Sequence, residues 1–166
     1  SRAALRTVLW LPECLNLTRP FATLRLCRLS ANERMDWLVE KATELGVAVI
    51  QPLMTERSVV RLDAQRGLKK LAHWQSITIA ACEQCGRNRL PQIDAPVDLP
   101  SALALATSSE MRVLLSPEAP DTLSSVVRAH GTGGTGTPCP SIALLIGPEG
   151  GLEDGEAVAA ARHGFL

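Results

Sequence analysis

The stretch that decides the fold class is Ile142-Ala143-Leu144-Leu145-Ile146 followed by Gly147-Pro148-Glu149-Gly150-Gly151. Its first half is a continuous apolar run, which is typical of a parallel strand buried on both faces. In its second half, glycine permits positive φ and a close approach of the backbone to a ligand, while proline stiffens the turn. The pattern predicts a buried strand that ends in a loop, and it leaves open whether this loop binds a ligand or only turns the chain.

Outward from this stretch, strand patterns alternate with helix patterns. Ser30 and Glu33 have the spacing of a capping box, which predicts a helix that ends at a left-handed cap on Gly46. Such alternation predicts an α/β fold with a mostly parallel sheet, in which ligands bind beyond the carboxyl ends of the strands. We expect strands over 5–11, 23–29, 47–53, near 93, over 111–115 and over 142–146, and helices between 30 and 46 and over 64–84, 100–106 and 153–163.

The long helix over 64–84 is expected to bury one apolar stripe and to stop at a basic loop. Gly86 ends this helix, and Arg87-Asn88-Arg89 follows it. Arginine pairs bidentately with phosphate and asparagine can read a base edge, so this segment is either a nucleic-acid contact or an ordinary solvated loop. The inward stripe of the helix is predicted to consist of Leu68, Leu71, Ala72, Ile79 and Cys82.

Composition and charge narrow the class of protein. The chain has 166 residues, 46% of them hydrophobic, which is enough for one compact domain, and it lacks the long apolar run of a membrane span. Its net charge is zero, but residues 1–90 hold 14 basic and 8 acidic side chains while residues 91–166 hold 3 and 9. Residues 1–90, with their excess of basic side chains, are therefore a candidate for the part of the chain that binds an anionic partner. Five cysteines without a secretory signal predict free thiols in the cytoplasm, and their spacing predicts no metal site.

Five motifs then occur in a fixed order, each of them modest alone. They are Arg-Met-Asp-Trp at 34–37, Glu-Lys-Ala-Thr-Glu-Leu-Gly-Val at 40–47, Thr-Glu-Arg-Ser at 55–58, Glu-Gln-Cys-Gly-Arg-Asn-Arg-Leu-Pro at 83–91 and Gly-Pro-Glu-Gly-Gly at 147–151. Together, from about residue 30 to the end, they resemble the RsmE family, the ribosomal RNA uridine-N3 methyltransferases of the SPOUT superfamily.

The resemblance implies a SPOUT-type α/β knot, a homodimer, and methyl transfer from S-adenosylmethionine to N3 of a uridine in 16S RNA of the small ribosomal subunit. It implies that Arg87, Asn88 and Arg89 face the RNA, and that Arg87 stabilises the anion that forms on the uridine. The cofactor-binding residues that it implies are Leu115, Ser116, Ile146, Gly147, Glu149, Gly150 and Gly151.

Two departures from the family pattern qualify this expectation. Residues 1–29 are too few for the family's N-terminal PUA-like barrel, so we interpret them as its last strands and residues 30–166 as the SPOUT domain. The family's closing motif, L-G-x-R-I-L-R-x-E-T-A, is missing, so the domain is expected to be truncated before the closing C-terminal knot segment. The alternative function is therefore a catalytically incompetent RNA-binding fragment. A Rossmann-type methyltransferase would need a G-x-G-x-x-G fingerprint, which the sequence lacks.

Overall fold

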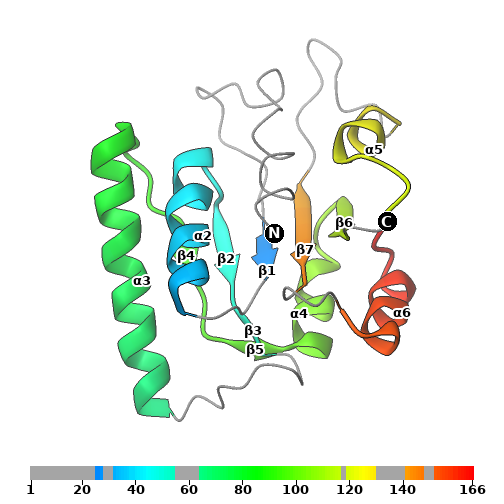
Figure 1. The fold of residues 1–166 in the computed structure, drawn as a ribbon, viewed down its shortest axis with the longest axis horizontal. Coiled ribbons are helices and arrows are strands. Elements are labelled where there is room, and N and C mark those ends of the chain that lie inside the picture. Colours follow the sequence, from blue (N-terminus) through cyan, green and yellow to red (C-terminus); the bar gives the residue numbers. More distant parts are fainter. Residues whose placement is uncertain (1–24, 28–31, 55–63, 117–118, 130–140, 148–151) are drawn as a thin grey trace.

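The computed structural model describes residues 25–27, 32–54, 64–116, 119–129, 141–147 and 152–166, and its elements alternate between strand and helix (Figure 1). The predicted strand over 5–11 lies outside these ranges. The strands are β1 (Arg25–Cys27), β2 (Val49–Gln51), β3 (Leu53–Met54), β4 (Gln92–Ile93), β5 (Val97–Asp98), β6 (Met111–Leu115) and β7 (Ile142–Ile146). The helices are α2 (Asn32–Leu45), α3 (Ala64–Cys85), α4 (Leu99–Ala106), α5 (Leu123–Ala129) and α6 (Asp154–Arg162).

The main sheet has five parallel strands in the order β4-β2-β1-β7-β6, which confirms the predicted α/β fold. The apolar run over 142–146 is β7, an inner strand with β1 on one side and β6 on the other. The single strand predicted over 47–53 is wrong in one respect, because Pro52 separates β2 from β3. The latter pairs with β5 in a second, two-stranded sheet, and the Pro52 carbonyl accepts a hydrogen bond from Val97.

Two apolar clusters cover opposite faces of the main sheet. Side chains alternate between the faces along a strand, and in β7 Leu144 and Ile146 belong to one cluster while Ala143 and Leu145 belong to the other. The first cluster contains residues of α2, α3 and α5, and the second contains residues of α4 and α6. The sheet is therefore sandwiched between two layers of helices, and α3 lies beside α2 on the outside of the first layer (Figure 1).

The buried face of α3 differs from the predicted one. Leu68 and Ile79 are 67% and 47% exposed, and Ala72 is also exposed, so most of the predicted inward stripe points to solvent. The helix turns inward at Trp74, which is 2% exposed and donates its indole N–H to Asp36 of α2 at 3.0 Å. Thr78, Ala81 and Cys82 continue this face, so only Cys82 and the half-buried Leu71 keep the predicted orientation.

The edge strands of the main sheet are β4 and β6, and they differ in length and in what lies beside them. At one edge, β4 has only two residues and follows the buried Pro91. At the other edge, Leu166 N–H donates to the Arg112 carbonyl at 3.0 Å, and Leu114 N–H donates to the Leu166 carbonyl at 2.8 Å. These two bonds have the pattern of a parallel ladder, so the outer edge of β6 is paired around Val113.

Arg112 projects from β6 toward the carboxyl ends of two helices. Its Nη1 donates to the carbonyls of Thr107 and Ser109, which follow α4, at 3.2 and 2.8 Å. Its Nη2 lies against Gly164, which follows α6 and has φ +77°, so that a Cβ on this glycine would be only 2.9 Å away. Arg112 thus connects the ends of α4 and α6 through a guanidinium, a favourable charge at helix carboxyl ends.

Candidate functional site

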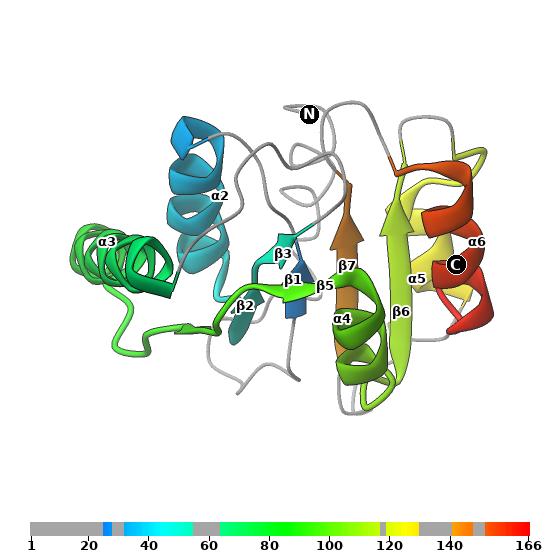
Figure 2. The ribbon, with the colours of Figure 1, turned by 90° about the horizontal axis from the view of Figure 1, so that it is seen from below.

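The carboxyl ends of β6 and β7 bring two predicted cofactor-binding segments together. Leu115 and Ile146 are register partners at the last position of each strand, and β6 and β7 run side by side (Figure 2). Ser116 is exposed and Gly147 is half-buried just beyond them. In parallel sheets a ligand binds in the crevice where the connections of neighbouring strands leave to opposite faces.

The connections after β6 and β7 have this divergent arrangement. The chain after β6 leads to α5, which packs in the first apolar cluster, and the chain after β7 leads to α6, which packs in the second. The first turn of α6 is closed by Glu156, whose carboxylate accepts a hydrogen bond from the Glu153 N–H at 3.0 Å. Residues 148–151 lie outside the described ranges, so the roles of Glu149, Gly150 and Gly151 stay predictions.

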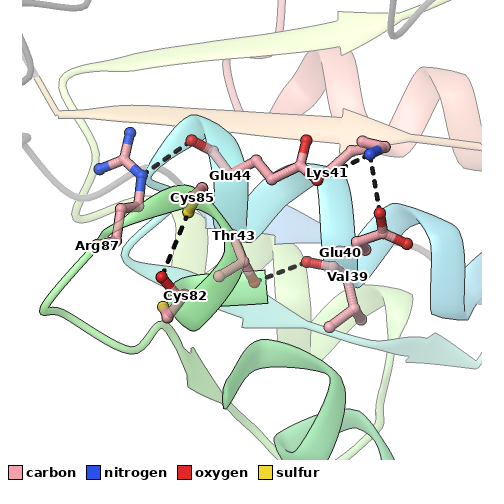
Figure 3. A network of polar contacts seen from close by, with 8 residues as sticks. All are labelled: Val39, Glu40, Lys41, Thr43, Glu44, Cys82, Cys85 and Arg87. Atoms are coloured by element: carbon pink, nitrogen blue, oxygen red, sulfur yellow. Dashed lines mark hydrogen bonds and ion pairs between the residues drawn. The ribbon is translucent and has the colours of Figure 1, made fainter. Parts of the chain in front are cut away.

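The basic loop after α3 is attached to its surroundings at four points. Gly86 has φ +72°, and Arg87 N–H donates to the Cys82 carbonyl at 3.1 Å. Arg87 Nε donates to the Glu44 carbonyl of α2 at 2.9 Å (Figure 3). Cys82 Sγ is 3.5 Å from the Arg89 carbonyl oxygen, and Gln92 N–H donates to Ala48 at 2.9 Å. The loop backbone is therefore held between α2, α3 and β2.

Arg87 and its two neighbours in the loop face different environments. Arg87 is half-buried, whereas Asn88 and Arg89 are exposed. The Arg87 guanidinium lies against Gly46, which has φ +82°, and a Cβ on this glycine would be 2.5 Å from Nη1. Within the described part of the chain, Nη2 of Arg87 is buried and makes no hydrogen bond. The side chain of Arg87 is thus directed to the carboxyl end of α2, where a cation is favourable.

The last turn of α2 carries a second set of polar contacts near this loop. Lys41 Nζ lies 2.8 Å from Glu40 and 2.7 Å from Glu44, and these carboxylates raise the pKa of Lys41 (Figure 3). Thr43 is buried and donates its hydroxyl to the Val39 carbonyl at 2.7 Å. Because Lys41 is already paired with two carboxylates, it adds little net positive charge to the neighbourhood of the loop.

The basic loop and the carboxyl edge lie at different ends of the sheet. Gln92, which follows the loop, is level with Val49, Arg25 and Ala143 in the strand register. Three strand spacings of about 4.8 Å and three residues of about 3.3 Å then separate Gln92 from Ile146, which gives roughly 17 Å. The described residues of one chain therefore do not bring Arg87 together with Leu115, Ser116, Ile146 and Gly147.

The described residues also include histidine, cysteine and acidic side chains outside these two segments. No group of three or more histidine, cysteine, aspartate or glutamate side chains in them is arranged to hold a metal ion. Cys82 is buried, and its burial raises the pKa of its thiol, whereas Cys85 is exposed. None of the described helices is both long and apolar enough to cross a bilayer.

Comparison with known families assigns this fold. A family model described as the RNA methyltransferase domain matches residues 20–166. The chain belongs to this RNA methyltransferase family. The match includes the carboxyl edge of β6 and β7 and the basic loop after α3, and it confirms the RNA methyltransferase class that the five motifs predicted.

Curated relatives agree with the family and refine it. The chain is 31% identical over 138 residues to ribosomal RNA small subunit methyltransferase E of Buchnera aphidicola subsp. Schizaphis graminum, and 32% identical over 128 residues to the protein of the same name from Synechocystis sp.. These alignments cover 83% and 77% of this chain, but 52% and 40% of the relatives. The chain thus spans about half the length of the curated relatives that it matches, and the predicted resemblance to RsmE is confirmed.

Solved structures of the family have the same fold. A protein from Legionella pneumophila, solved with bound S-adenosylmethionine, is 39% identical with a TM-score of 0.74, over 87% of this chain and 56% of that one. Ribosomal RNA small subunit methyltransferase E from Neisseria gonorrhoeae, also bound to S-adenosylmethionine, is 34% identical with a TM-score of 0.70, over 89% and 57%. Both proteins are thus similar to this chain in sequence and in fold.

Proposed function

We propose that the protein containing this chain transfers a methyl group from S-adenosylmethionine to N3 of a uridine in 16S ribosomal RNA. The observation that carries the proposal is the meeting of Leu115–Ser116 and Ile146–Gly147 at the carboxyl edge of the sheet, in a member of an RNA methyltransferase family. Similar proteins solved with S-adenosylmethionine support this choice of cofactor.

The residues at the carboxyl edge suit such a cofactor. Beyond Leu115 and Ile146 the two connections lead to opposite faces of the sheet, and this divergence suits an adenine or a ribose at the ends of the two strands. Ser116 places a small polar side chain at the exposed end of β6, and Gly147 lets the backbone approach closely. S-adenosylmethionine supplies an electrophilic methyl group when bound. Glu149, Gly150 and Gly151 complete the proposed cofactor site.

The exposed side chains of the basic loop suit an RNA partner. Asn88 and Arg89 can contact base edges and phosphate from the surface. Uridine N3 is a weak acid, so it must lose its proton before it attacks the methyl group, and the resulting anion needs a nearby positive charge. Gln92, which follows the basic loop, lies roughly 17 Å from Ile146 within one chain, and this separation argues against a direct contact of Arg87 with a uridine at the carboxyl edge.

A cofactor titration tests the first half of this proposal. Isothermal titration of the full-length protein with S-adenosylmethionine should give one-to-one binding, and Gly150→Val should abolish it, because a β-branched side chain would fill the space that glycine leaves. Gly155→Val is the matched control, since a Cβ on Gly155 in α6 meets no atom within 4 Å. Equal binding by wild type and Gly150→Val would remove this loop from the cofactor site.

An RNA methylation assay tests the second half. Small-subunit ribosomal RNA incubated with the protein and S-adenosylmethionine should yield N3-methyluridine on nucleoside mass spectrometry. RNA binding without any cofactor binding would favour the alternative, an RNA-binding fragment that is catalytically incompetent. The proposal includes the knot, the homodimer and the cytoplasmic location that the resemblance to RsmE implies. Sedimentation equilibrium of the full-length protein tests the dimer.

A further inference from the structure

We infer that Arg87 is a positioning residue that holds the exposed tip Asn88-Arg89-Leu90 in a fixed form for binding RNA, and that Arg87 itself does not contact the RNA. The inference rests on the proposed function for the identity of the partner. The sequence had grouped Arg87 with Asn88 and Arg89 as one RNA-facing set. The contacts of the three residues divide this set into an anchor and a tip.

The first step of the argument concerns the anchor. Arg87 uses Nε to bond the Glu44 carbonyl at 2.9 Å and packs its guanidinium against Gly46, while Nη2 is buried without a hydrogen bond in the described residues, so the side chain is held at the end of α2. Its backbone N–H is also taken up, by the Cys82 carbonyl. The Arg87 guanidinium caps the carboxyl end of α2, and the Arg87 backbone N–H caps the carboxyl end of α3. Arg87 therefore connects the two helices. The same atoms cannot reach a phosphate outside without breaking these contacts.

The second step concerns the tip. Asn88 and Arg89 are exposed, and Leu90 is 56% exposed, so the three side chains next to the anchor point to solvent. Their backbone is held on the other side by the contact of Cys82 Sγ with the Arg89 carbonyl and by the buried Pro91. An amide, a guanidinium and an apolar side chain on a fixed backbone suit an unpaired stretch of RNA, where bases can be hydrogen-bonded and stacked.

The third step is energetic. A binding loop that samples many conformations loses affinity in proportion to the fraction of time it spends in the competent one. If loss of the anchor reduces this fraction to about one tenth, the Kd for RNA rises about tenfold although no contact with RNA has been removed. A phosphate contact behaves differently, because its loss also reduces the number of counterions released on binding and hence the salt dependence of Kd.

The test is therefore a salt titration of RNA binding by the full-length protein. The probe is fluorescently labelled small-subunit ribosomal RNA, and the slope of log Kd against log KCl concentration is compared among variants. Arg89→Ala should weaken RNA binding and reduce the slope by about 1, as expected for the loss of one phosphate contact. Arg87→Ala should raise Kd about tenfold and leave the slope unchanged. Arg87→Lys, which keeps a donor for the Glu44 carbonyl, should recover most of the affinity.

Two further variants separate positioning from general damage. Arg112→Ala removes another partly buried arginine that bonds helix-end carbonyls, and it should lower the Tm without changing Kd or slope. Gly46→Ala pushes the Arg87 guanidinium away while every basic residue stays in place, and it should reproduce the effect of Arg87→Ala on Kd. Gly46→Ala also tests the inference if Arg87→Ala does not fold.

Several outcomes would overturn the inference. A lower slope for Arg87→Ala would make Arg87 a phosphate contact, and an unchanged Kd would make it a structural residue only. If Arg112→Ala raised the Kd for RNA as much as Arg87→Ala does, the rise would be due to lost charge or lost stability and not to positioning of the tip. Failure of the wild-type protein to bind the RNA at all would instead refute the proposed function, so the two failures are distinguishable.

Discussion

Substitution of Gly46 by alanine should destabilise the fold through two separable effects. Gly46 has φ +82°, a conformation that costs an L-residue about 1–2 kcal/mol. A Cβ there would also lie 2.5 Å from Arg87 Nη1 and 2.7 Å from Nη2, so the guanidinium must move. Its hydrogen bond to the Glu44 carbonyl would then be weakened or lost, at a further cost of about 1–1.5 kcal/mol.

The expected total for Gly46→Ala is about 2–3.5 kcal/mol, or a fall in Tm of roughly 5–12 °C for a domain of this size. Equilibrium urea unfolding followed by circular dichroism measures the free energy, with two alanine controls. Gly86 has φ +72° but an added Cβ would meet no atom within 4 Å, so Gly86→Ala should cost only the backbone strain. Gly67 lies within α3 without positive φ, and Gly67→Ala should stabilise by about 0.5–1 kcal/mol.

A double-mutant cycle isolates the contact of Gly46 with Arg87. In an Arg87→Ala background the guanidinium is absent, so Gly46→Ala should cost only as much as Gly86→Ala does. Equal costs for Gly46→Ala and Gly86→Ala in the wild-type background would refute the reasoning. An unchanged cost of Gly46→Ala after removal of Arg87 would refute it as well.

Three other predictions follow from single contacts. Trp74→Phe removes the indole donor to Asp36 and should destabilise by about 1.5–3 kcal/mol in urea unfolding, whereas Trp37→Phe, in an exposed position, should cost little. Burial raises the pKa of Cys82, so at pH 8 iodoacetamide should modify Cys85 about tenfold faster than Cys82 in single-cysteine variants; equal rates would contradict the burial. Asp98 caps α4 through the Ser101 N–H, and its hydrogen bonds with the side chain and then the backbone of Ser101 hold the pKa of its carboxyl below the usual value. Its contribution is present above the unfolded-state pKa and is lost as the pH falls through the lower folded-state pKa, so the stability gap to Asp98→Ala should close as the pH falls below the usual range for a carboxyl group. A gap independent of pH would assign the effect to something other than the carboxylate.

The sequence predicted the elements whose signals are local. The strands over 111–115 and 142–146 agree with β6 and β7 at both ends, because β7 is apolar throughout and β6 is apolar except for Arg112. The ends of α2 and α3 also agree, since Gly46 and Gly86 both take the left-handed conformation that a helix end favours. The placement of two candidate cofactor segments at one edge follows from the parallel topology alone.

The failures arise from contacts between distant residues. Two apolar stripes run along α3, and the choice between them depends on the packing of Trp74 against Asp36, which is 38 residues away. Helix α5 was not predicted, although Thr122 at its start accepts a hydrogen bond from the Ser125 N–H, a cap that the pattern Thr-Leu-Ser-Ser could have indicated.

The candidate RNA-facing residues show the same limit. Arg87 and Arg89 flank Asn88 in the loop, and no local sequence pattern indicates which arginine is directed inward. The difference depends on the room above Gly46, a residue of another helix. Sequence patterns identified the loop as a unit, but its division into an anchor and a tip needed the tertiary structure.

The local structure of the two sheet edges has a consequence for aggregation. A long, unpaired edge strand is a template on which another chain can extend the sheet. Here β4 offers only two residues after a proline, and the outer edge of β6 is paired around Val113 by Leu166. Strand addition at these two edges of the main sheet is therefore disfavoured.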